Sequence, residues 1–85
     1  MAELKSRHYT IGVTNEIKSV NSVRELMPID GDIQMWYGEF DGDDADMLVK
    51  GMVIPAGKLI EHVATHDGII VMRAVAGTVN MHEVR

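Results

Sequence analysis

The sequence predicts a small, mainly β domain, built as an antiparallel barrel or sandwich with at most one helix. Short runs of strand-forming residues recur through its second half about 8–12 residues apart, a spacing typical of small all-β folds. Clear turn signals at residues 55–57 (Pro-Ala-Gly) and 66–68 (His-Asp-Gly) separate these runs. The 85 residues are enough for one domain, and we assign residues 1–85 to a single one.

The N-terminal segment predicts one strand and no export signal. Residues 7–13 (RHYTIGV) alternate in polarity and are rich in β-forming side chains. Residues 1–10 contain no apolar stretch like the core of a signal peptide. We therefore expect a cytoplasmic protein.

Residues 14–27 are ambiguous between a helix and a hairpin. Apolar side chains recur there at helical spacing, and Pro28 would end a helix. The sequence therefore favours a helix, which would make the fold α+β. The alternative is a hairpin in which strands 17–20 and 23–26 flank a turn at residues 21–22.

The rest of the chain predicts strands joined by turns and one acidic loop. Residues 33–40 (IQMWYGEF) are strand-forming, and both faces of that strand would be partly apolar. Residues 41–46 (DGDDAD) predict a solvated loop, because like charges repel and stay exposed. Further strands are expected at residues 47–54, 58–64, 69–75 and 78–84, with turns at residues 30–32, 55–57, 65–68 and 76–77.

Composition argues against several classes of protein. The formal net charge is −5, with 13 acidic and 8 basic residues, so the chain lacks the basic footprint of a nucleic-acid-binding protein. No apolar run reaches the roughly 18 residues that cross a membrane as a helix. There are no cysteines, which excludes disulfides, thiolate metal sites and cysteine nucleophiles. We expect neither nucleic acid nor a membrane as a partner.

The acidic run also supplies candidate partner-binding residues. These are Asp41, Asp43, Asp44 and Asp46. A surface of this charge suits a basic groove on a protein partner, and its charges would raise the association rate at low salt. The run is not an EF-hand, because the loop counted from Asp41 lacks the required residues at its fifth, sixth and twelfth positions.

Three aromatic residues that lie close together in the sequence form a second candidate partner-binding set: Trp36, Tyr37 and Phe40. Aromatic side chains are enriched at the energetic centres of protein interfaces. Core filling is their alternative role. The seven methionines leave the same two alternatives open, because their flexible side chains suit both small cores and adaptable binding faces.

The histidines suggest a different hypothesis, namely a metal or small-molecule site. His62, His66 and His82 could converge at one mouth of a barrel, since residues distant in sequence meet on one face of an antiparallel sheet. Three imidazoles with a nearby carboxylate would suit a transition metal ion such as Zn²⁺ or Ni²⁺. Separate, half-exposed histidines are the alternative.

Residues 55–78 resemble one half of a cupin, a family of small β-barrels. The Pro-x-Gly turn at residues 55–57, His66 and Gly77 follow one another in the order and spacing of that family. The resemblance implies a barrel with a metal or small-molecule site. Of three metal ligands in the family's motif only His66 is present, and Ala64 and Ile70 occupy the other two positions.

We expect a small, acidic, non-catalytic binding or assembly protein without a cofactor. The chain contains no G-x-S-x-G nucleophile elbow and no glycine-rich phosphate loop. It would act as a homo-oligomer or by docking on a protein partner, by analogy with phage-type accessory proteins and inhibitors. The alternative function is a cupin-like domain that holds one transition metal ion at its histidines.

Overall fold

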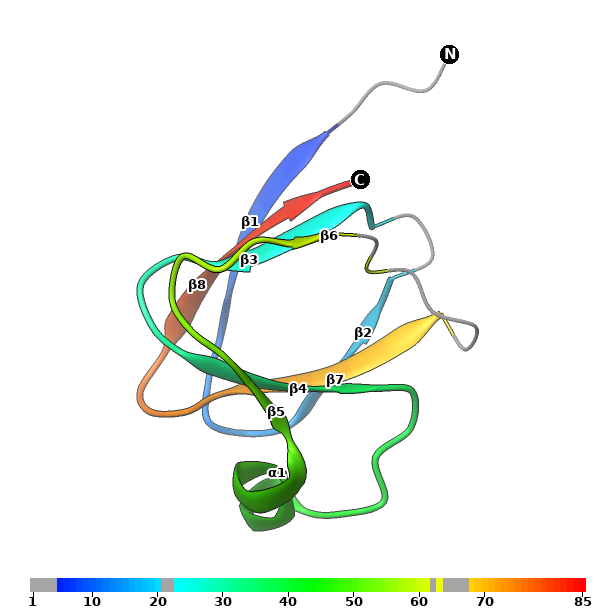
Figure 1. The fold of residues 1–85 in the computed structure, drawn as a ribbon, viewed down its shortest axis with the longest axis vertical. Helices are drawn as coiled ribbons and strands as arrows, with labels where there is room; N and C mark the ends of the chain where they lie inside the picture. Colours follow the sequence, from blue (N-terminus) through cyan, green and yellow to red (C-terminus); the bar gives the residue numbers. More distant parts are fainter. Residues whose placement is uncertain (1–4, 21–22, 62, 64–67) are drawn as a thin grey trace.

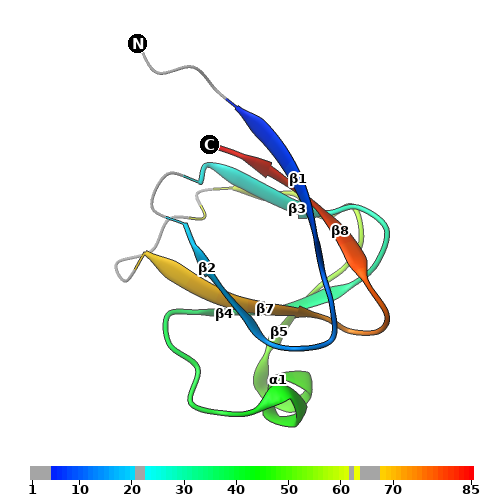
Figure 2. The same cartoon turned by 180° about the vertical axis from the view of Figure 1, so that it is seen from behind.

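The computed structural model describes residues 5–20, 23–61, 63 and 68–85. These residues form two four-stranded antiparallel sheets and one short helix. The two sheets face each other as a sandwich, and neither closes into a barrel (Figure 1 and Figure 2). The prediction of a small, mainly β fold with at most one helix is confirmed.

We name the two sheets by their strand orders. Sheet I has the order β1-β8-β3-β6 and sheet II has the order β2-β7-β4-β5. The strands of sheet I are β1 (Ser6–Ile11), β8 (Val79–Val84), β3 (Glu25–Pro28) and β6 (Ile60–Glu61). Those of sheet II are β2 (Glu16–Ser19), β7 (Ile69–Ala74), β4 (Ile33–Tyr37) and β5 (Met52–Ile54). The helix α1 (Asp44–Lys50) connects β4 to β5.

Four predicted strands are found at the expected places. The predicted strand 7–13 overlaps β1 over residues 7–11, and the predicted strands 33–40, 69–75 and 78–84 contain β4, β7 and β8. The expected turns are also present at residues 55–57 and 76–77. Gly57 and Gly77 have φ values of 80° and 62°, in the left-handed region that a side chain would strain.

The helix expected at residues 14–27 is wrong, and so is the hairpin pairing. The segment forms two strands, but β2 pairs with β7 in sheet II whereas β3 pairs with β8 and β6 in sheet I. The turn proposed at residues 21–22 lies outside the described residues. Ile17 and Val20 are β-branched and suit extended backbone, and each strand finds its partner elsewhere in the chain. Tertiary pairing therefore outweighs a weak helical pattern.

The acidic loop and the strand expected after it are also partly wrong. Residues 44–50 form α1, so only residues 52–54 of the predicted strand 47–54 are extended. Asp43 is the N-cap, and Asp43 and Asp46 form a reciprocal capping box. Acidic side chains at a helix N-terminus stabilise it, because they accept bonds from its free N–H groups and face its positive end. Within the described part of the predicted strand 58–64, only β6 is extended.

The main core fills the space between the sheets. Its members are apolar side chains that alternate along the strands, among them Ile11, Leu26, Ile33, Met35, Ile70, Met72, Ala74 and Met81. Three of the methionines lie in this core, and Met47 is buried separately beneath α1. Gap-filling thus accounts for these four methionines.

The helix α1 lies across the outer face of sheet II, the face turned away from sheet I (Figure 1). At its N-terminal end, the Asp44 carboxylate accepts a bond from the backbone N–H of Asn15 at 2.7 Å, and the Asp44 carbonyl accepts one from Arg73 Nη1 at 2.9 Å. At its C-terminal end, the Leu48 carbonyl accepts a bond from Gln34 Nε2 at 2.9 Å. The helix therefore runs from the β2 side of the sheet towards its β5 edge.

A group of charged side chains surrounds Tyr9 near β1, β2 and the end of β8. The carboxylate of Glu83, in β8, is buried and lies 2.8 Å from Arg85 Nε and 3.9 Å from Arg7 Nε. Two cations lie close to the ring of Tyr9: Lys18 Nζ is 4.8 Å and the guanidinium carbon of Arg7 is 5.3 Å from the ring centroid. Burial, and then the charge of Glu83, raise the pKa of the Tyr9 phenol from 10.0 to about 12.

This raised pKa predicts a loss of stability at alkaline pH. The folded protein favours the neutral phenol, so the contribution of Tyr9 is complete below pH 10 and is lost as the pH rises towards about 12. Urea unfolding as a function of pH should show a shallower alkaline decline for Tyr9→Phe than for the unsubstituted protein. Tyr37→Phe, which leaves Tyr9 in place, is the control and should retain the full decline. Equal slopes for all three proteins would contradict the assignment.

Candidate functional site

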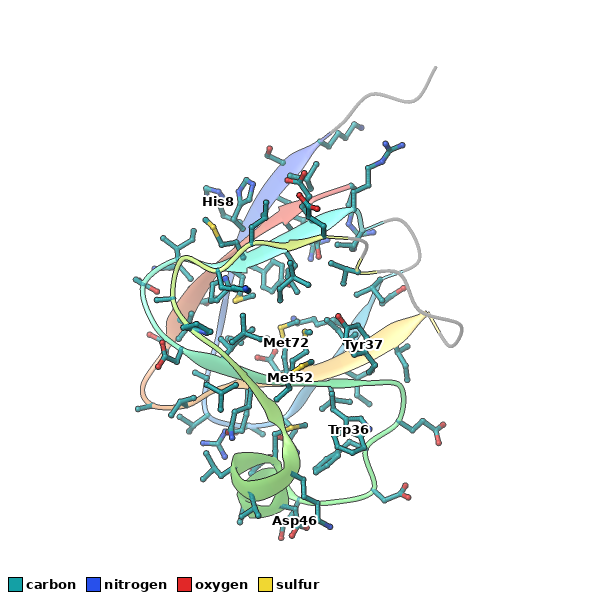
Figure 3. The ribbon with its side chains drawn as sticks, viewed as in Figure 1. His8, Trp36, Tyr37, Asp46, Met52 and Met72 are labelled. Carbon is teal, nitrogen blue, oxygen red and sulfur yellow. The ribbon has the colours of Figure 1, made fainter. Side chains whose placement is uncertain are left out.

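The aromatic set splits between the two faces of sheet II. Trp36 and Tyr37 are neighbours on β4, and their side chains point to opposite sides of the strand (Figure 3). Trp36 points to the side of α1, where its ring centroid lies 5.3 Å from that of Phe40. Tyr37 lies on the same face as Ile33 and Met35, at an exposed end of the sandwich. Two of the three predicted aromatic residues therefore come together.

Beside α1, an apolar row crosses the outer face of sheet II. The strand register places Ile17 and Trp36 on either side of Val71, in β2, β4 and β7. Ile17 is 71 % exposed although it is a large aliphatic residue in a sheet. Sequence reasoning missed this row, because residues 14–27 were expected to form a helix.

An open pocket of about 350 Å³ lies at one end of this row. Ile17, Ile69 and Val71 belong to the strands that underlie it. Its remaining lining comes from Asn15 and from the segment that follows β4, namely Glu39, Phe40, Asp41 and Gly42. The pocket thus combines apolar strand residues, one aromatic ring and two carboxylates.

The acidic residues have two different roles. Asp46 Oδ2 accepts a bond from the Asp43 N–H at 3.0 Å, and Asp43 Oδ1 accepts one from the Asp46 N–H at 2.9 Å. Asp44 accepts the bond from Asn15 described above. Three of the four predicted aspartates therefore stabilise the helix start and its attachment to β2. Asp41 instead lines the pocket, together with Glu39, which the sequence analysis did not single out.

The structure tests the predicted histidine cluster only at His82, because His62 and His66 lie outside the described residues. His82 is paired across the strands with His8 on the outer surface of sheet I, and their nitrogens Nδ1 and Nε2 lie 3.0 Å apart. Among the described residues, no three His, Asp or Glu side chains come close enough together to hold a metal ion. His82 itself does not lie in the space between the sheets.

The comparisons with known proteins find no matching family model, curated protein or solved structure. The resemblance to a cupin therefore stays a prediction. Within the part of the chain described, no helix has the length and apolar character needed to cross a membrane.

The capping box predicts that Asp43 contributes to the stability of the fold and that Asp41 does not. Asp43→Ala removes the N-cap and should lower the free energy of unfolding by about 0.5–2 kcal/mol. Asp43→Asn removes the same charge but keeps a good capping group, so its stability should remain near that of the unsubstituted protein. Asp41→Ala, outside the helix, is the matched control in thermal or urea unfolding. If Asp43→Ala and Asp41→Ala were equally stable, the capping role would be refuted.

Proposed function

We propose that this protein is a small, non-catalytic binding or assembly protein that acts as a homo-oligomer or by docking on a protein partner. The open pocket beside α1 is the observation that carries the docking half of this proposal. We infer that the pocket receives a short segment of a partner that presents an apolar side chain next to a lysine or arginine. Such a mode of action fits an accessory or inhibitor-like protein.

The chemistry of the pocket supports this class of partner. An apolar side chain placed over Ile17 and Val71 would remove exposed aliphatic surface from water, at about 25 cal/mol for each Å² buried. The ring of Phe40 would offer a large and rigid contact, as aromatic residues do at interface hot spots. Glu39 and Asp41 lie beside these residues, and they would attract a cationic group on the same segment.

The negative charge around the pocket also favours a partner with basic residues. The net charge of the chain is −5, and Asp43, Asp44 and Asp46 lie next to the pocket in sequence. Their carboxylates accept bonds from the neutral backbone N–H groups of Asn15, Asp43 and Asp46, and such bonds do not cancel a charge. Such a charge distribution would accelerate encounters with a basic partner more than it would tighten the final complex.

The test is selection of a random peptide library on the immobilised protein. The selected peptides should pair apolar residues with lysine or arginine. Phe40→Ala should weaken their binding at least about fivefold, equivalent to roughly 1 kcal/mol. The double variant Glu39→Gln/Asp41→Asn should weaken binding mainly at low salt, because the Debye length is only about 10 Å at 0.1 M.

Glu61→Gln is the matched control for this experiment. Glu61 is exposed on β6 of sheet I, so its substitution removes one charge without touching the pocket. Selected peptides that lack basic residues, or that bind all variants equally, would overturn the docking proposal.

The alternative proposal is the cupin-like histidine site, holding one transition metal ion or a small molecule. The pair His8–His82 is the observation that favours it, because two imidazoles on neighbouring strands already lie at contact distance on the outer surface of sheet I. Native mass spectrometry should then show one metal ion per chain after incubation with Zn²⁺ or Ni²⁺. His82→Ala should abolish that mass increase, whereas Glu61→Gln should not. A protein that stays metal-free would exclude the metal form of this alternative.

A further inference from the structure

The edge strands of the two sheets differ in how they are protected. Edge strands expose unpaired N–H and C=O groups, and charged side chains commonly guard them against pairing with another chain. β1 carries Arg7, β2 carries Glu16 and Lys18, and β6 carries Glu61. β5, at the remaining edge, consists of Met-Val-Ile and carries no charge.

The surface around β5 is also unusually apolar. Met52 and Val53 are 45 % and 56 % exposed. Just before them, at the end of α1, Leu48 is exposed and Val49 is 84 % exposed. Four of the six residues from Leu48 to Val53 are thus large apolar side chains in contact with solvent. Lys50 and Gly51 are the other two.

The hydrogen-bonding direction of β5 follows from its neighbours. The Val75 N–H donates to the Asp32 carbonyl and the Gly38 N–H donates to the Ile69 carbonyl, both in line with the β4–β7 register. In an antiparallel ladder the bonded pairs alternate, so Gln34 and Trp36 bond towards β7. Ile33 and Met35 must then bond towards β5.

This alternation fixes which groups of β5 are free. Ile54 and Met52 are the register partners of Ile33 and Met35, so their backbone groups face β4. The N–H and C=O of Val53 therefore point out of the sheet edge. On either side the potential ladder stops, because the Gly51 N–H donates to the Met47 carbonyl and Pro55 has no N–H.

We propose that β5 pairs with β5 of a second copy of this chain, antiparallel about a two-fold axis at Val53. The outward N–H of Val53 would donate to the Val53 carbonyl of the second copy. The Val53 N–H of the second copy would donate back to the carbonyl of the first. Met52 would lie opposite Ile54, and Gly51 opposite Pro55, so no charged residues meet within the paired segment. The two sheets II would become one continuous sheet of eight strands.

A second copy is the occupant that these features favour. The edge offers one donor and one acceptor on the same residue, which is the self-complementary pattern that a two-fold interface requires. The paired segment ends at the same two residues on both chains, so its length is matched automatically. The axis is perpendicular to the sheet, which places both α1 helices on the same face, with Leu48 and Val49 close to the seam.

Val53→Lys tests this dimer directly. It would place two like charges opposite each other at the axis, where such pairs are destabilising, and should raise the dimer dissociation constant about fivefold in sedimentation equilibrium. Val75→Lys, at an exposed valine in the β7–β8 turn, is the matched control and should dimerise like the unsubstituted protein. Phe40→Ala should also dimerise normally, because this proposal does not depend on the pocket.

Amide hydrogen exchange of the unsubstituted protein provides a second measurement that needs no variant. The Val53 amide should become more protected as protein concentration rises. The Ser19 amide should not change: the Val20 N–H donates to the Gly68 carbonyl, so the alternating ladder turns Ser19 towards the guarded β2 edge. A protein that stays monomeric at all concentrations would overturn the proposal. A dimer that persists in Val53→Lys, or whose Val53 amide exchanges independently of concentration, would do the same.

Discussion

The attachment of α1 to sheet II determines the shape of its outer face, and that attachment depends on Arg73. This arginine is only 5 % exposed, and it lies on β7, which pairs on both sides within its sheet. Its guanidinium donates to the carbonyls of Ala74 and Asp44 at 3.0 and 2.9 Å. A buried charge is tolerated only when such bonds replace its lost hydration. The buried Arg73 guanidinium needs a hydrogen-bond acceptor, and the Asp44 carbonyl at the start of α1 provides it. This bond therefore fixes the position of the helix start on sheet II.

Much of the surrounding architecture follows from this anchor. A seven-residue helix is about 10 Å long, roughly the width of two strand spacings. With its first turn held near Asn15 and Arg73, its last turn reaches Gln34, and Gly51 then passes directly into the edge strand β5. A Cβ on Gly51 would lie 2.6 Å from the Met47 carbonyl and 2.5 Å from its sulfur, so the tight exit from the helix needs glycine.

The sequence predicted the strands whose pattern is locally unambiguous and missed the segments decided by distant partners. β7 and β8 combine strong strand formers with glycine-containing turns, so their local signals agree with the fold. In residues 44–50, by contrast, Leu48 and Val49 suggest a strand, whereas the decisive features are the capping box and the buried Arg73. The capping pattern Asp43-x-x-Asp46 was readable, but the clustered charges favoured a solvated loop. The closeness of Ile17, Val71 and Phe40 depends on strand order, which local patterns do not encode.

The proposed pocket and the proposed dimer seam lie at different ends of α1, so one does not block the other. The pocket lies beside the β2–β7 half of the sheet, whereas the seam lies at β5. A two-fold axis perpendicular to the sheet would leave both pockets open on one face of the dimer. Two linked pockets can bind a repetitive partner far more tightly than one, because the second contact forms at a high effective concentration. A shallow pocket that binds weakly by itself would then suffice for stable docking on an assembly with repeated subunits.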